Sequence, residues 1–239
     1  MFQLELSGRC LVFKLVGPAD HYYDAAVALA CAVYRQSYGA VIAPRPHRFV
    51  VCIDRATDAP IACAGLSFGG GAPLFSEHYL DEPLERLLAG VFQRDVARRD
   101  IAEVTALATL EPSIGTELVR AVPLICWYLG LRGILCTVTT KLRRGFANLK
   151  LPFHQIAVAD PARLPLVEGV QWGTYYDTKP VTGVVRLDAL GEFFDTVSCR
   201  YNQQLLAGES ADGVEDLAAR MNDLRDASAA PAVGQGVAA

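Results

Sequence analysis

The stretch Glu103 to Val122 combines residues that could bind and process a ligand. It reads EVTALATLEPSIGTELVRAV, in which alternating apolar residues predict a strand, followed by a short loop and a helix start. A helix N-terminus after a strand commonly binds phosphate through free backbone amides. Here Pro112 has no amide proton, Gly115 is the single glycine, and Glu111 and Glu117 would repel a diphosphate. A purely structural helix start is the alternative interpretation.

Cysteine and histidine show no spacing that is typical of a metal or disulfide site. The seven cysteines are scattered, most of them in apolar runs, and no C-x-x-C pair occurs. We expect buried thiols in a reducing compartment. The four histidines, at positions 21, 47, 78 and 154, have no H-x-x-x-H spacing, so no metal site is expected.

Composition and charge narrow the function classes. The chain has 239 residues, 52% of them hydrophobic, with a net charge of −4 and no block of five basic residues, so nucleic acid is not an expected partner. The N-terminal segment alternates like a strand and carries charges, unlike a signal peptide. No apolar run approaches the roughly 20 residues that cross a bilayer. We therefore expect a cytoplasmic protein without integral membrane association.

Hydrophobic periodicity and turn residues predict alternating strands and helices. Helices are expected to begin at Asp20, Asp81 and Ser113, and the third to end at Gly130. The predicted order is strands within 2–16, a helix at 20–39, a hairpin at 48–70, a helix at 79–93, a strand at 100–110, a helix at 112–133, a strand at 133–140, a helix at 141–151, strands within 153–160 and 172–190, and a helix at 190–207. An antiparallel first half followed by βαβ units predicts one α/β domain on a mixed sheet.

Five segments carry a family resemblance: YRQSYGA, AGLSFGGGAPLFSEHYLDEPLE, IAEVTALA, CTVTTKLRRGFANLKLP and WGTYYDTKP. With the predicted element order, they make the chain similar to the GNAT acyltransferase fold, and residues 20 to 185 more specifically resemble the bacterial thermostable hemolysin family. That family is grouped with the GNAT and autoinducer-synthase folds. Its typical E-V-G-N-L-A reads EVTALA here, so Thr105 and Ala106 replace a glycine and an asparagine. A contact that the asparagine makes in relatives is therefore either absent or serves a different substrate.

The resemblance implies a GNAT-like mixed, twisted sheet flanked by helices, in one domain that spans 1–187. Residues 188–226 are expected to form a C-terminal helical extension and 227–239 a disordered tail. Acyl-homoserine-lactone synthases, which look similar, move a fatty acyl group from acyl carrier protein to an amine.

In such a fold, strands 101–109 and 134–140 splay apart and the donor's pantetheine arm pairs with the exposed strand edge. The donor-binding residues implied are Val104, Thr105, Leu107, Thr109, Ser113, Gly115, Thr139, Arg143 and Asn148. Because the glycine loop that usually binds the diphosphate of CoA is missing, acyl carrier protein, with its single phosphate, is favoured over acyl-CoA. The basic cluster Lys141, Arg143 and Arg144 is either a docking surface for an acidic carrier protein or a phosphate, or a solvated helix face.

Three residues are assigned to catalysis by the same resemblance. Glu103 would take a proton from an ammonium nucleophile or position a water, and an ion pair with Arg98, Arg99 or Arg132 is the alternative. Glu77 could bind the ammonium, and Tyr79 could shape an acyl tunnel or act as the acid. A helix-capping loop is the alternative for both, and His78 is expected to be exposed.

The acceptor and acyl pocket is assigned to Tyr38, His47, Trp172, Tyr175 and Tyr176, with core packing as the alternative for the aromatic cluster. The sequence thus predicts an N-acyltransferase that uses an acyl-phosphopantetheine thioester and a small-molecule amine, with no tightly bound cofactor. The alternative is a non-catalytic carrier-protein-binding or membrane-active protein, although no strongly amphipathic basic helix is visible. Whether the chain forms a homodimer is left open.

Overall fold

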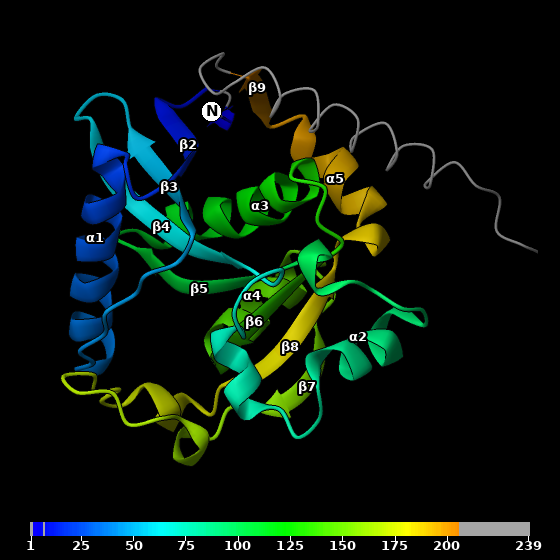
Figure 1. Ribbon diagram of the computed structural model, residues 1–239. Helices are drawn as coiled ribbons and strands as arrows, with labels where there is room; N and C mark the ends of the chain where they lie inside the picture. The colour runs from blue at the N-terminus through cyan, green and yellow to red at the C-terminus, as the bar shows by residue number, and fades with distance from the viewer. Residues whose placement is uncertain (1, 7, 206–239) are drawn as a thin grey trace, which may run out of the picture.

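The computed structural model describes residues 2–6 and 8–205, and these form a single sheet with helices on both faces (Figure 1). Within this part of the chain nine strands lie in the order β7-β8-β6-β5-β4-β3-β2-β1-β9. The strands are β1 (Phe2–Leu6), β2 (Leu11–Val16), β3 (Arg48–Asp54), β4 (Ala59–Phe68), β5 (Ile101–Thr109), β6 (Gly133–Val138), β7 (His154–Val158), β8 (Val181–Arg186) and β9 (Tyr201–Leu205). Among the described strands only β5 and β6 pair in parallel, so the sheet is mixed, as predicted.

Five α-helices connect the strands: α1 (His21–Tyr38), α2 (Leu84–Phe92), α3 (Pro112–Tyr128), α4 (Thr140–Asn148) and α5 (Gly191–Ser198), and a 3₁₀ segment, η1 (Phe75–Tyr79), precedes α2. Side chains alternate between the faces of a strand, which sorts the helices into two layers. Phe49 and Val51 of β3 pack against α1, and Ile101 of β5 packs against α2 on the same face. The opposite face, with Val50 and Ala102, packs against α3. None of the described helices is long and apolar enough to cross a membrane.

Several predicted boundaries differ from those observed. Helix α1 has the predicted cap, because the Asp20 carboxylate accepts the Tyr22 amide at 2.9 Å. Helix α2 instead begins at Leu84, since Asp81 forms an ion pair with Arg163 and does not cap it. Helix α3 begins at Pro112 without a side-chain cap, so the expected Ser113 cap is wrong.

The predicted helix over 190–207 is wrong in its second half. It ends at Ser198, and β9 then pairs with β1. The Tyr201 ring stacks edge-on against Phe13 at 5.9 Å, and its hydroxyl donates to Glu117 of α3. These tertiary contacts favour the strand. The part of the expected helical extension beyond residue 205 and the expected tail at 227–239 lie outside the described residues, and the boundary at 187/188 stays a prediction.

Candidate active site

The parallel strands β5 and β6 separate in the middle of the sheet. Their pairing ends at Val104 and Cys136, although β5 continues to Thr109 and β6 to Val138. Within the described residues, the later part of β5 therefore has no partner strand on its β6 side. Backbone amides and carbonyls of such a segment can pair with an extended ligand. This is the splay that the sequence predicted.

A β-bulge lies beside the splay. Ala106 and Leu107 of β5 together oppose Ala64 of β4, because the register shifts between Cys63 and Gly65. Ala106 has a φ of 48°, in the left-handed region that alanine rarely occupies. A bulge bends its strand and increases its twist, which helps β5 to turn away from β6.

Several side chains in these central strands keep accessible surface, which a closed sheet would bury. Val104, Thr105 and Leu107 of β5 and Thr137 of β6 are only partly buried. The sheet is therefore open where its central strands separate.

Glu103 lies at the start of the splay and is almost fully buried, with 1% of its surface exposed. Its two carboxylate oxygens accept the backbone amides of Phe75 and Ser76, each at 2.7 Å. Burial is the largest influence and raises the pKa of Glu103, while hydrogen bonds from Ser76 and Phe75 oppose the increase. No described arginine pairs with Glu103. The carboxylate thus fixes the start of η1.

Glu77 is paired with an arginine in the same segment. Its carboxylate accepts two hydrogen bonds from Arg98, at 2.6 and 3.0 Å, and the Leu74 amide at 2.6 Å. Burial alone would raise the pKa of Glu77, but Arg98 and the Leu74 amide outweigh it and the pKa is lowered. This ion pair occupies the carboxylate that was expected to bind an ammonium group. His78 is exposed, as expected.

The expected aromatic residues come together. Tyr79 from η1 and Tyr176 share a hydrogen bond of 2.5 Å between their hydroxyls, and Trp172, Tyr175 and Tyr38 stack beside them. Ring centroids of neighbouring pairs in this group lie 5.2–5.7 Å apart. The loop that carries Trp172 and the two tyrosines is joined to the end of α1, because the Thr174 amide donates to the Tyr38 carbonyl at 2.8 Å.

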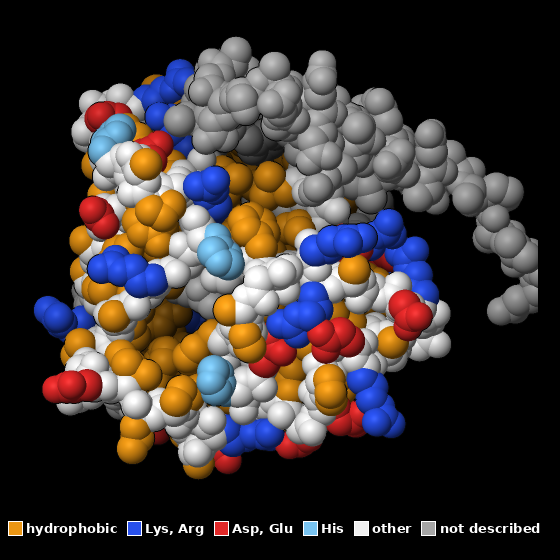
Figure 2. All heavy atoms as spheres, viewed as in Figure 1, with side chains coloured by type: hydrophobic (Ala, Val, Ile, Leu, Met, Phe, Trp, Pro, Cys, Tyr) orange, Lys and Arg blue, Asp and Glu red, His pale blue; other side chains and the backbone are white. Residues whose placement is uncertain are grey.

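Two further aromatics belong to this cluster and were not assigned from the sequence. Tyr34 stacks on Tyr175 at 6.0 Å, and Phe75 lies 5.8 Å from Trp172. The spacing of Tyr34 and Tyr38, one helical turn apart, was the available signal. Figure 2 shows a hollow on this face of the molecule, lined mainly by hydrophobic side chains, between α1 and the segment that precedes α2.

The other expected acceptor residue, His47, makes its contacts at a different place. It is exposed, its Nδ1 accepts the Phe68 amide at 2.9 Å, and its ring stacks on Phe68. Ser67 in this region lies in a G-x-S-x-G sequence, residues 65–69. A nucleophile elbow places such a serine in a strand-to-helix turn, whereas Ser67 lies inside β4, so the match is not an elbow.

The expected donor residues surround the splay or the helix starts beyond it. Thr109 donates to the Glu111 carbonyl at 2.6 Å, and a Cβ on Gly115 would meet the Thr109 Cγ2 at 2.9 Å. Thr139 caps α4, Arg143 donates to Gln155, and Ser113 and Asn148 are exposed. Gly115 therefore lets α3 approach β5 closely.

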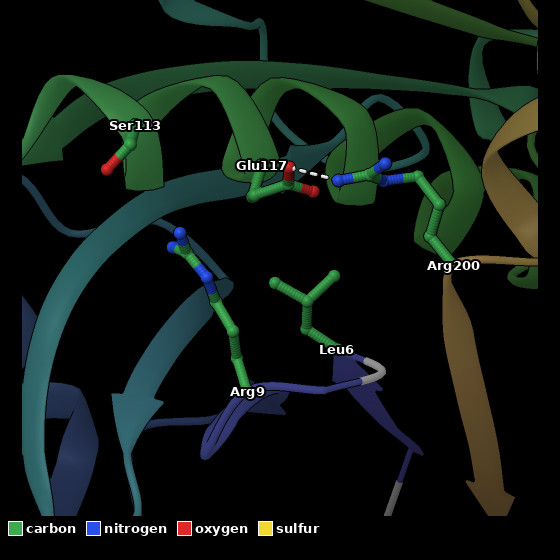
Figure 3. Close-up of a pocket in the computed structure, with 5 residues that line it drawn as sticks. All are labelled: Leu6, Arg9, Ser113, Glu117 and Arg200. Carbon is green, nitrogen blue, oxygen red and sulfur yellow. Dashed lines mark hydrogen bonds and ion pairs between the residues drawn. The ribbon is translucent and has the colours of Figure 1, made fainter.

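A separate pocket of about 320 Å³ lies beside the N-terminal half of α3 and is lined by Leu6, Arg9, Ser113, Glu117 and Arg200 (Figure 3). Glu117 is buried there and accepts from Arg120, Arg200 and the Tyr201 hydroxyl at 2.7, 2.6 and 3.0 Å. These bonds join α3 to β9. The Glu117 carboxylate therefore has a structural role.

The family described as thermostable hemolysin matches residues 16–190. The chain belongs to this family. A comparison with curated proteins finds no match for this thermostable hemolysin-family chain.

Solved structures share its fold. The CoA-dependent acyl-homoserine lactone synthase BjaI, solved with SAM and isopentyl-CoA, is similar with a TM-score of 0.53 and 14% identity, over 87% of this chain and 98% of BjaI. The AHL synthase LasI gives a TM-score of 0.50 at 10% identity, over 85% of this chain and 100% of LasI. The predicted GNAT-like, autoinducer-synthase-like fold is therefore confirmed for this member of the family.

Proposed function

We propose that this protein is an N-acyltransferase that moves an acyl group from a phosphopantetheine thioester to the amine of a small molecule. The observation that carries the proposal is the splay of β5 from β6, which leaves the later part of β5 without a partner strand on its β6 side within the described residues. A pantetheine arm is extended and carries amides, so it can pair with such an edge. The acyl-transferring synthases that share the fold support the same class of reaction.

The reaction is a direct displacement. The amine nitrogen attacks the thioester carbonyl, the C–N bond forms, the C–S bond breaks, and the proton lost by nitrogen goes to the departing thiolate. Backbone amides of the β5 edge would polarise the carbonyl. Because both Glu103 oxygens already accept backbone amides, its geometry supports a positioning role for η1, which carries Tyr79. The hydrogen-bonded hydroxyl pair of Tyr79 and Tyr176 is a candidate to hold or pass the proton.

The two helices beyond the splay favour acyl carrier protein as the donor. Helix α3 begins with Pro112, which has no amide proton, beside the exposed carboxylate of Glu111. By contrast Lys141, Arg144 and Lys150 on and after α4 are exposed and form no ion pair within the described part of the chain. Next to them Phe146, Ala147, Leu151, Pro152 and Phe153, with Arg143 and Lys150, line an open groove. An acidic, amphipathic partner helix fits a basic, apolar groove.

The test is an acylation assay. The purified protein is incubated with an acyl carrier protein or CoA, each loaded with acyl groups of increasing length, and with a pool of amines, and amides are followed by mass spectrometry. Amide formation that is faster from the carrier protein is expected. Amide formation from CoA alone would contradict the donor assignment. This arm is included because BjaI, which shares the fold, is named as a CoA-dependent synthase. Absence of amide with every donor would reject the enzyme, and leakage of vesicle contents in a parallel assay would support a membrane-active protein.

A further inference from the structure

Three tyrosine hydroxyls in the aromatic cluster have no hydrogen-bond partner among the described residues. Tyr34, Tyr38 and Tyr175, here called the tyrosine triad, have ring centroids 5.6, 6.0 and 5.2 Å apart. None of the three hydroxyls hydrogen-bonds to a described residue. The Tyr175 side chain is the most enclosed, since only 7% of that residue is exposed.

The Tyr175 hydroxyl nevertheless reaches open space. Every buried side-chain oxygen in the described part of the chain has a hydrogen-bond partner. Since the Tyr175 hydroxyl has none, it must touch accessible volume. Tyr34 and Tyr38 also keep accessible surface, although burial raises the pKa of both phenols. Groups that are both deep and accessible line the wall of a hollow.

Other buried tyrosines in this protein are bonded. Tyr22 donates to Asp58, Tyr23 to the Pro46 carbonyl, Tyr201 to Glu117, and Tyr79 is bonded to Tyr176. Buried hydroxyls normally have such partners. Three unpartnered hydroxyls on adjacent rings therefore indicate a place where a ligand supplies the missing hydrogen bonds.

No charged side chain hydrogen-bonds to the triad within the described part of the chain. After burial, the influences on the pKa of Tyr34 come from Tyr38, Cys63 and Tyr176, none of them an ion at neutral pH. The nearby carboxylates of Glu103 and Glu77 are already bonded to backbone amides and to Arg98. A carboxylate that lies against the triad would lose hydration, and none of these neighbours is a cation that could compensate for the loss.

We propose that the tyrosine triad selects the acceptor, and that the acceptor is an arylalkylamine without a carboxylate, whose amine is its one group that is charged at neutral pH. This inference rests on the proposed function. An aromatic body stacks on the tyrosine rings, a neutral hydroxyl on that body bonds to the triad, and an amino acid's carboxylate is excluded. A desolvated amine also favours its neutral, nucleophilic form, so the hollow itself assists attack on the thioester.

The experiment measures amine binding without a donor, by calorimetry, and then amide formation. The probes are tyramine, phenethylamine, which lacks the phenolic hydroxyl, and tyrosine, which adds the carboxylate. Tyramine is expected to bind about fivefold more tightly than phenethylamine, as one hydrogen bond gives. Tyrosine is expected to bind at least about tenfold more weakly than tyramine.

Variants locate the selectivity. Tyr38→Phe and Tyr175→Phe should each reduce the preference for tyramine over phenethylamine and leave phenethylamine binding unchanged. Tyr128→Phe, on α3 across the sheet, is the matched control and should keep the preference. Because each variant is compared with two ligands, a loss of folding would lower both affinities and would be recognised by the melting temperature.

The outcomes separate this inference from the proposed function. Amide formation with tyrosine at least as efficient as with tyramine would overturn the inference and leave the acyltransferase standing. Failure of all three amines to bind would also overturn it. Selective tyramine binding without amide from any donor would retain the site and reject the proposed function.

Discussion

Glu103 combines deep burial with two backbone hydrogen bonds, and this decides what the residue can do. A general base needs a lone pair that is open to the proton it removes. Here Phe75 and Ser76 each take one lone pair of one oxygen, and the remaining lone pairs belong to a residue with only 1% of its surface exposed. We therefore propose that the carboxylate acts through the segment that it fixes, in which Phe75 and Tyr79 contact each other and Phe75 contacts Trp172.

Replacement of Glu103 by glutamine tests this role. One amide oxygen can accept a backbone N–H, but the side-chain NH₂ then faces the second N–H, so Glu103→Gln should lose about 1–3 kcal/mol of unfolding free energy. Ser67→Ala, at the position on β4 that pairs with Glu103, should reduce the unfolding free energy by less.

The loss should also depend on pH. Burial raises the pKa of Glu103 above its unfolded value, so this residue's contribution is fully present below the ordinary carboxyl range and declines as pH rises through the raised pKa. The difference between the wild type and Glu103→Gln should therefore be larger near pH 4 than near pH 8 in urea unfolding. A difference that grows with pH would show the opposite sign and contradict the assignment.

Ala106 occupies the left-handed conformation at the bulge, at the position where the family typically has asparagine. That conformation costs alanine about 1–2 kcal/mol, and asparagine tolerates it better. Glycine removes the cost. Ala108→Gly is the control, because it removes a methyl from the same buried cluster at a residue of ordinary φ. Both variants should lower the unfolding free energy, and the decrease for Ala106→Gly should be smaller by about 1–2 kcal/mol. Equal losses in denaturant unfolding would show that the bulge is unstrained.

At the scale of elements, η1 depends on contacts that are far apart in sequence. Glu103 accepts its first amides, Arg98 binds Glu77, and the Ser76 hydroxyl lies 2.9 Å from that of Thr137 on β6. The sequence identified both carboxylates but offered Arg98 as a partner of Glu103. Local pattern cannot tell which carboxylate the fold brings to that arginine. The aromatic cluster was easier to predict, because WGTYYDTKP is contiguous.

The approach of α3 to β5 predicts an effect of a methyl group at Gly115. Alanine there gains about 1 kcal/mol of helix propensity, but its Cβ would lie 2.9 Å from Thr109 Cγ2, and overpacking costs about 1–3 kcal/mol. Gly115→Ala should be neutral or destabilising in the wild type and stabilising in a Thr109→Ser background, which removes Cγ2.

The double-mutant cycle in thermal unfolding measures this coupling. Gly145→Ala on α4, where a Cβ would meet nothing within 4 Å, is the control and should stabilise by about 1 kcal/mol. Additive effects at Gly115 and Thr109 would mean that α3 is free to move away from β5.

At the scale of the whole molecule, the sequence predicted the βαβ core and its splay but not the far edge of the sheet. The apolar spacing at 190–207 is typical of a helix. Strand β9 forms instead because β1 has an edge with which it can pair, and because Glu117 accepts a hydrogen bond from the Tyr201 hydroxyl. The formation of such a strand depends on partners about 200 residues away in the chain, as the pairing of Phe2 with Leu205 shows. Local propensity is overridden in this way where an edge can be covered.

The distribution of charge gives a prediction of the same scale. The chain has a net charge of −4, yet Lys141, Arg144 and Lys150 project from one region without acidic partners among the described residues. Such a basic surface in an acidic protein would attract an acidic carrier protein and speed its association.

Lys141→Glu with Arg144→Glu should weaken carrier-protein binding about tenfold at low salt and flatten its salt dependence, measured by surface plasmon resonance. Arg86→Glu with Arg94→Glu, on and just after α2, changes the net charge by the same amount away from α4 and should change binding little. If both reversals weaken binding equally, net charge and not the α4 surface attracts the partner.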